Sequence, residues 1–86
     1  MQKEKDRYVV ITTIGPNRPG LMSEISSVIS EFGCNIEDLD QVVMKRNIFV
    51  LSMLVNIPIN VNIDKLREKM SKICNEIGLE VFFYYA

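Results

Sequence analysis

A chain of 86 residues that is 48% hydrophobic and 24% charged predicts one folded, soluble domain. Its net charge of -1 gives no reason to expect nucleic-acid or acidic-membrane binding, and no apolar run approaches the ~20 residues of a membrane span. There is no histidine, which argues against zinc sites and His-based acid–base catalysis, and the two cysteines have no metal-ligand spacing. We therefore expect no metal, no cofactor and no catalysis, with the cytoplasm as the default location.

The first half of the chain predicts a strand, a corner and a helix. Residues 1–6 are polar and are expected to form a flexible N-terminus, while residues 7–86 form the domain. Residues 7–14 are rich in β-branched side chains and predict a strand. After a corner at residues 15–20, apolar residues recur at three- and four-residue steps. They predict a helix over residues 19–32 that ends at Gly33.

The second half continues with two strands, a helix and a last strand. Residues 34–44 and 48–57 predict strands, joined by a hairpin turn in which Asn47 takes a positive φ. Asn62 is the expected N-cap of a helix over residues 63–77 that ends at Gly78, and residues 79–85 predict the final strand. The order βαββαβ with right-handed crossovers predicts an α+β, ferredoxin-like sandwich. In this fold a four-stranded antiparallel sheet carries both helices on one face.

The predicted strands carry apolar residues on both faces, although the helices cover only one. Strand 48–57, for example, places Phe49 and Leu51 on one side and Val50 and Leu54 on the other. A soluble monomer rarely exposes an apolar patch of that size. We therefore expect a homodimer, in which a second copy covers the free face, extends the sheet edge to edge or does both. A tetramer is a further expectation.

The corner at residues 15–20 reads Gly-Pro-Asn-Arg-Pro-Gly. The prolines stiffen it, and Gly15 and Gly20 allow unusual backbone angles or close approach of another group. On spacing alone, a plain turn explains these residues. The alternative is an anion site, because the first helical turn offers free N–H groups beside Asn17 and Arg18. Asn35 opens the next strand and is expected to lie near Asn17, where the two amides could donate to and accept from an amino acid.

For three acidic residues and the two cysteines, a structural interpretation is simpler than a functional one. Glu37, Asp38 and Asp40 could together hold a hard cation, but a solvated strand edge is the favoured interpretation. Cys34 and Cys74 are expected to be packed residues rather than reactive ones.

Residues 17–21, Asn-Arg-Pro-Gly-Leu, then a helix, then residues 33–36, Gly-Cys-Asn-Ile, resemble the ACT domain, a small regulatory module that binds amino acids. The resemblance spans about residues 7–85. The chain is similar to single-domain ACT proteins and to one half of tandem ACT proteins such as the glycine-cleavage regulators. The resemblance implies that two domains pair and that a ligand sits at their interface. The main chain of residues 20–22 would receive its carboxylate, and two asparagines would hold it across that interface. The implied ligand-binding positions are Asn17, Arg18, Gly20, Leu21, Met22, Asn35 and Ile36.

The leading hypothesis is a non-enzymatic, homodimeric module that binds a small amino acid and reports it to a metabolic enzyme or a regulator. The second hypothesis is a ligand-free assembly subunit of such an enzyme or regulator. The third is RNA binding, since RNA-recognition domains share this topology. The aromatic motif expected on the central strands is missing, however, and the slight negative charge also disfavours it.

Overall fold

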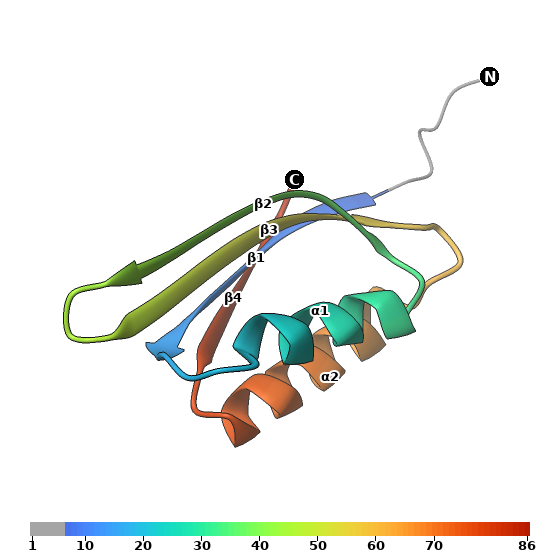
Figure 1. Cartoon of the computed structure of the whole chain (residues 1–86). Coiled ribbons are helices and arrows are strands. Elements are labelled where there is room, and N and C mark those ends of the chain that lie inside the picture. The colour runs from blue at the N-terminus through green and yellow to red at the C-terminus, as the bar shows by residue number, and fades with distance from the viewer. Residues whose placement is uncertain (1–6) are drawn as a thin grey trace.

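The computed structural model describes residues 7–86, so the flexible N-terminus predicted for residues 1–6 lies outside the described residues. The elements are β1 (Arg7–Pro16), α1 (Leu21–Glu31), β2 (Asn35–Met44), β3 (Ile48–Ile57), α2 (Ile63–Glu76) and β4 (Glu80–Tyr85). The four strands form one antiparallel sheet in the order β2-β3-β1-β4. Both helices lie on the same side of it (Figure 1). The predicted ferredoxin-like fold is therefore confirmed.

Two element boundaries differ from the prediction at the corner between β1 and α1. The strand continues to Pro16, which stands opposite Ile48 at the end of the β1–β3 ladder. The helix begins at Leu21 rather than at residue 19, because Gly20 has a φ of 90° and occupies the N-cap in the left-handed region. Pro19 therefore precedes the helix instead of lying in its first turn.

Both helices end in the same hydrogen-bonded motif. At the end of α1, the N–H of Gly33 bonds to the carbonyl of Ser30 at 2.9 Å, and the N–H of Cys34 bonds to that of Ile29 at 3.1 Å. The corresponding bonds follow α2, where Gly78 has a φ of 84°. This pattern needs a left-handed residue after the helix, and glycine adopts that conformation without a side-chain penalty. The two predicted helix stops are confirmed.

The hydrophobic core lies between the sheet and the helices. In β3 the residues alternate between buried and half-buried, so one face of the strand is fully enclosed. The largest enclosed side chains come from β1, β3 and both helices; they include Ile11, Leu21, Ile25, Phe49, Met53, Leu66 and Met70. Thr13 is also completely buried, and within residues 7–86 its hydroxyl has no hydrogen-bond partner.

Gly15 is required by packing rather than by its backbone angles. A Cβ atom at this position would lie 2.7 Å from the carbonyl oxygen of Gly78 and 2.6 Å from a side-chain carbon of Leu79. The turn between α2 and β4 thus rests directly on the main chain of β1. Any larger residue would push that turn away from the sheet.

The sheet face opposite the helices, here called the open face, carries the remaining alternate residues of each strand. Val10 of β1 lies between Leu54 of β3 and Tyr84 of β4, and Thr12 lies between Ser52 and Phe82. The large apolar side chains most exposed on this face are Tyr8, Ile14, Val42, Met44, Phe82 and Tyr84. No element of residues 7–86 covers this face (Figure 1).

Candidate functional site

The start of α1 is the first part of the candidate site. An α-helix leaves its first N–H groups without partners inside the helix. Here the N-cap is Gly20, and no side chain within residues 7–86 caps this end. The side chain of Leu21 is buried in the core and the half-buried side chain of Met22 packs against it, so the main-chain N–H groups are the polar groups that these residues offer to a ligand. The exposed helix start suits a carboxylate or another small anion.

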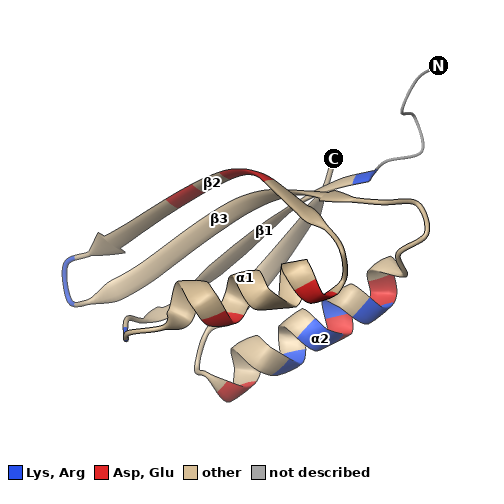
Figure 2. Ribbon diagram, turned by 45° about the vertical axis from the view of Figure 1, so that its right-hand side comes forward, with Lys and Arg blue, Asp and Glu red and all other residues tan. Residues whose placement is uncertain are grey.

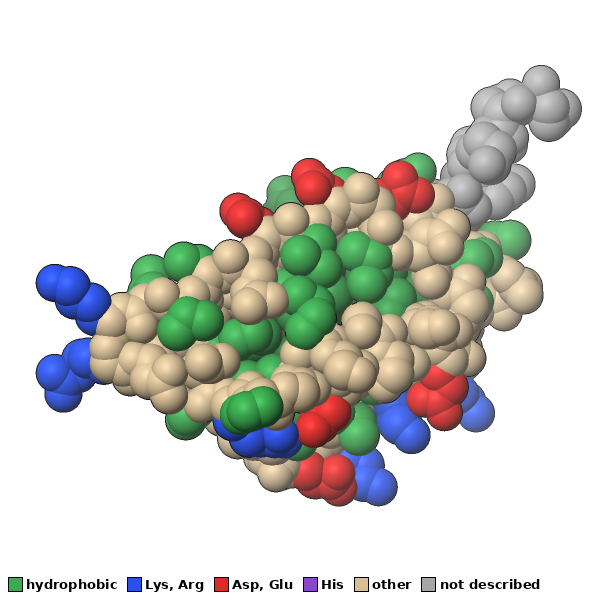
Figure 3. Space-filling view, viewed as in Figure 1, with side chains coloured by type: hydrophobic (Ala, Val, Ile, Leu, Met, Phe, Trp, Pro, Cys, Tyr) green, Lys and Arg blue, Asp and Glu red, His purple; other side chains and the backbone are tan. Residues whose placement is uncertain are grey.

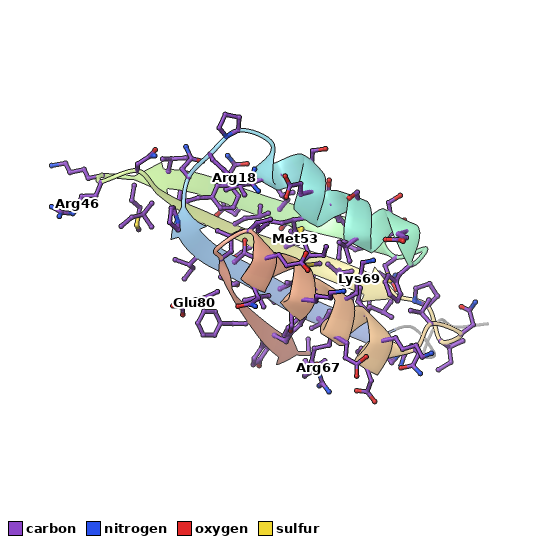
Figure 4. The ribbon with its side chains drawn as sticks, turned by 90° about the horizontal axis from the view of Figure 1, so that it is seen from below. Arg18, Arg46, Met53, Arg67, Lys69 and Glu80 are labelled. Atoms are coloured by element: carbon purple, nitrogen blue, oxygen red, sulfur yellow. The ribbon has the colours of Figure 1, made fainter. Side chains whose placement is uncertain are left out.

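Arg18 folds back over this helix start. Its guanidinium donates two hydrogen bonds to the carboxylate of Glu24, at 3.2 and 3.1 Å, and a third to the carbonyl of Pro19 at 3.2 Å. Figure 4 shows Arg18 beside the beginning of α1. Both side chains of the ion pair are about two-fifths exposed, at 43% and 41%, so the pair stabilises the fold only weakly. Glu24 was not predicted as a partner, although an acidic residue in the first turn of a helix is a recognisable signal.

Asn17 is tied to the hairpin between β2 and β3. Its main-chain N–H bonds to the carbonyl of Asn47 at 2.9 Å, and its side-chain amide donates to the Asn47 side chain at 3.2 Å. The amide of Asn47 in turn donates to the carbonyl of Asn17 at 3.3 Å. Asn47 has the predicted positive φ, 61°, and so does Arg46, at 69°. The two asparagines lock the corner onto the hairpin, a contact that the sequence analysis did not anticipate.

Asn35 lies at the other end of the sheet from Asn17. It opens β2 and pairs with Asn56, whereas Asn17 contacts Asn47 at the far end of β3. Asn56 follows Asn47, which immediately precedes β3, by nine residues of extended chain, and this corresponds to roughly 30 Å. The expectation that Asn17 and Asn35 lie close together within one chain is therefore wrong. The crossover helix carries the chain back along the sheet before β2 begins.

The edge strand β2 connects these two ends. Within residues 7–86 its only neighbouring strand is β3, and nine of its ten residues are exposed. Leu39 and Val43 pair with the buried residues Met53 and Phe49, so they lie on the helix side of the sheet, yet they are 41% and 45% exposed. Figure 3 shows hydrophobic side chains gathered between β2 and α1. The free edge and the exposed apolar side chains beside it form one continuous surface that runs from Asn35 to the hairpin.

The charges along β2 are divided between its two ends. Glu37, Asp38 and Asp40 lie within its first six residues, and Glu37 occupies a bulge where the register with β3 shifts. Lys45 and Arg46 form the hairpin tip that follows its second half (Figure 2). The side-chain amide of Asn56 donates to Glu37 at 3.3 Å. No group of three or more His, Cys, Asp or Glu side chains within residues 7–86 is arranged to hold a metal ion.

The cysteines provide no reactive group. Cys34 and Cys74 are both buried and unpaired. Burial raises the pKa of the Cys74 thiol to about 11 and also raises the pKa of Cys34, so both are protonated at neutral pH. In the part of the chain that the structure describes, neither helix has the length and apolarity needed to cross a membrane.

Comparison with known proteins gives a consistent result. Residues 7–84 match the family model of the ACT domain. A UPF0237 protein of Methanopyrus kandleri is 44% identical over 73 residues, which cover 84% of this chain and 80% of that relative. The glycine cleavage system transcriptional repressor of Escherichia coli is 38% identical over 56 residues, 65% of this chain and 29% of that protein. An ACT domain protein from Streptococcus pneumoniae has the same fold, with a TM-score of 0.81 at 22% identity over 93% of this chain and 90% of that one.

Proposed function

The chain belongs to the ACT domain family, and we propose that it is a non-enzymatic regulatory module that binds a small amino acid in a site shared by two identical chains. The observation that carries this proposal is the placement of Asn17 and Asn35 at opposite ends of the free edge strand. One chain cannot bring both amides to one ligand. Two chains can, provided that their β2 strands run antiparallel to each other.

A two-fold axis perpendicular to the sheet gives this arrangement. It joins the two β2 edges into one continuous sheet, and it places the first residues of one strand beside the last residues of the other. Asn35 of one chain then approaches the hairpin of its partner, to which the partner's Asn17 is bonded. Two equivalent sites result, each with one asparagine from either chain and the start of one α1 helix.

The charges of β2 favour the same arrangement. In an antiparallel pair, Glu37 and Asp38 in the first half of one strand face the second half of the other, which is followed by Lys45 and Arg46. A parallel pair would instead align acidic residues with acidic residues, and like charges directly opposite destabilise strand pairing. The charges on this edge therefore favour an antiparallel over a parallel pairing of two β2 strands.

The chemistry of the site matches a zwitterion. The ligand carboxylate would accept bonds from the N–H groups at the start of α1, with Arg18 adjacent. The ligand ammonium needs acceptors, and the side-chain carbonyl of Asn17 is used in no hydrogen bond within residues 7–86. A ligand at the seam stabilises the dimer by its preference for the paired state, which is how binding would be reported to an enzyme or regulator. The free cysteines support a reducing compartment, the cytoplasm.

Two measurements test this function. Sedimentation or light scattering should give a dimer of the 9.9 kDa chain. Calorimetry and thermal unfolding with each of the twenty amino acids at millimolar concentration should identify at least one that binds. A ligand at 100 times its Kd raises the unfolding free energy by about 2.7 kcal/mol. A monomer at every concentration would overturn the shared site, and no response to any amino acid would overturn ligand binding.

One observation favours the second candidate, a ligand-free assembly subunit. Arg18 is already paired with Glu24, and Asn17 is already bonded to Asn47, so the fold itself uses part of the site's hydrogen-bonding capacity. A stable dimer that responds to no amino acid, and that is retained by a purified enzyme or regulator, would identify the protein as such a subunit.

A further inference from the structure

The open face is apolar enough to need a covering. Large side chains such as these present roughly 150–250 Å² when fully accessible. Phe82 and Tyr84 are 53% and 68% exposed, and Val42 and Met44 are 48% and 55% exposed. Together with their half-buried neighbours they approach or exceed the ~300–600 Å² that is typical of the largest apolar patch on a monomer. An edge-to-edge dimer through β2 would leave this face uncovered in both chains.

The open face also contains a hollow. Its volume is about 170 Å³, and its floor is formed by Val10, Ser52 and Leu54 in the middle of the sheet. The hydroxyl of Ser52 is bonded to that of Thr12 at 2.9 Å. The two hydroxyls would therefore remain hydrogen-bonded to each other if an apolar side chain entered the hollow. The hollow is suited to one large aliphatic or aromatic side chain.

Within residues 7–86, the charged side chains on this face are all acidic. Asp38 and Asp40 stand on the rim of the hollow, and Glu80 lies at the start of β4. The Lys and Arg residues of the described chain lie elsewhere, at the hairpin tip, at the corner, at the start of β1 on the helix side, and along α2 (Figure 2). An apolar floor with an acidic rim favours a basic partner over an acidic one at this face.

A second copy of the chain matches this face poorly. Stacking two open faces would bring six carboxylates into one contact without a basic residue, and like charges across an interface cost several kcal/mol. The phosphates of a nucleic acid would meet the same repulsion, even though aromatic side chains are exposed here. A partner with basic residues and an apolar ridge has neither disadvantage.

From these features we infer that the open face is the docking surface for a basic amphipathic helix of a partner protein. A large apolar side chain of that helix fills the hollow above Ser52, and its neighbours along the ridge contact Phe82 and Tyr84. Its Lys or Arg residues pair with Asp38 and Asp40. This surface uses none of the residues assigned to the amino-acid site, so it stands or falls independently of that site.

A model peptide tests the inference directly. The probe is a synthetic 18-residue helix of leucine and lysine with one apolar stripe. Two controls accompany it: a scrambled peptide of the same composition and an amphipathic peptide with glutamate in place of lysine. The full chain, labelled with ¹⁵N, is titrated with each peptide. The basic amphipathic peptide should bind at least about tenfold more tightly than either control. The largest amide shifts should occur at Val10, Ser52, Leu54 and Phe82.

Charge variants separate the open face from the rest of the surface. D38K/D40K should weaken binding of the basic peptide by about tenfold or more and should strengthen binding of the glutamate peptide. The matched control is E31K/E76K, which makes the same change in net charge at exposed positions at the ends of the two helices. This control should leave binding to the open face unchanged.

Several results would overturn the inference. Equal binding of the amphipathic and scrambled peptides would show charge attraction without a docking site. An equal loss of basic-peptide binding in both charge variants would show the same. Conversion of a dimer to a monomer by F82S/Y84S would assign the face to a second copy. Shifts of the same residues by a single-stranded RNA oligomer, with tighter binding than the peptide, would assign the face to nucleic acid.

Discussion

A site shared between chains predicts complementation between two defective variants. At ligand concentrations near the wild-type Kd, Asn17→Ala and Asn35→Ala should each leave little measurable binding of the amino acid, because each variant weakens both sites of its own dimer. In a mixed dimer the two substitutions fall together in one site. The other site then receives Asn17 from the chain with the Asn35 substitution, and Asn35 from the chain with the Asn17 substitution. One intact site should therefore reappear when the two inactive proteins are mixed.

The size of each effect follows from the contacts. A hydrogen bond to a charged group contributes about 1.5–3 kcal/mol, so each single substitution should weaken binding by roughly 10- to 150-fold. Random exchange of chains makes about half of the dimers mixed, and in each mixed dimer one of the two sites is intact. The mixture should therefore bind about one quarter as much ligand as the wild-type protein, with the wild-type Kd.

Calorimetry on the mixture measures this stoichiometry directly, using an amino acid already shown to bind the wild-type protein. Brief unfolding and refolding of the mixed proteins ensures that the chains exchange, and the separately refolded variants serve as controls. Recovery of no binding would show that the two asparagines do not meet across an interface. Full binding in either single variant would show that the asparagine is not a ligand contact at all.

Four further predictions concern stability. Gly15→Ala should lower the unfolding free energy by about 1–3 kcal/mol in chemical denaturation, because the new Cβ would collide with the α2–β4 turn; an unchanged midpoint would contradict that packing. Asn62→Ala removes an acceptor that binds two helix N–H groups at 2.9 and 3.1 Å, and should cost about 1 kcal/mol, while Asn60→Ala in the same loop serves as the neutral control. Thr13→Val replaces a buried hydroxyl that has no partner within residues 7–86, and should raise the melting temperature; a lower value would show that the hydroxyl is bonded in solution. Cys74 keeps its proton more tightly in the folded chain than in the unfolded chain, so stability should fall as pH rises from about 9 to 11. In Cys74→Ala, the unfolding free energy measured by chemical denaturation should change less with pH across this range.

The elements and their ends could be predicted because they depend on local chemistry. Gly33, Gly78 and Asn47 adopt the left-handed conformations that their positions required, and Asn62 caps α2 with its own side chain. The alternation of β1 and β3 likewise fixed which residues face the helices. Each of these inferences needed only a few neighbouring residues and one physical rule.

The arrangement of the candidate site could not be predicted from the same rules. Eleven helical residues carry the chain roughly 16 Å away from the corner, so Asn35 begins β2 at the opposite end of the sheet from Asn17. The bonds of Asn17 to Asn47, and of Arg18 to Glu24, depend on side chains that meet only after the sheet and hairpin have formed. Sequence spacing could propose Asn17 and Arg18 but not the partners that the fold gives them.

The strand β2 explains why so small a fold can present two separate surfaces. Its residues alternate, so Leu39 and Val43 lie on the helix side of the sheet while Asp38 and Asp40 lie on its open face. A shift of one residue in its register would exchange the two sets. The bulge at Glu37 and the bonds between Asn17 and Asn47 hold the strand near its two ends, so the register is fixed where a free edge would otherwise allow slippage. Because the proposed seam and the open face share this one strand, we expect a ligand that orders β2 at its edge also to order the acidic rim on the open face.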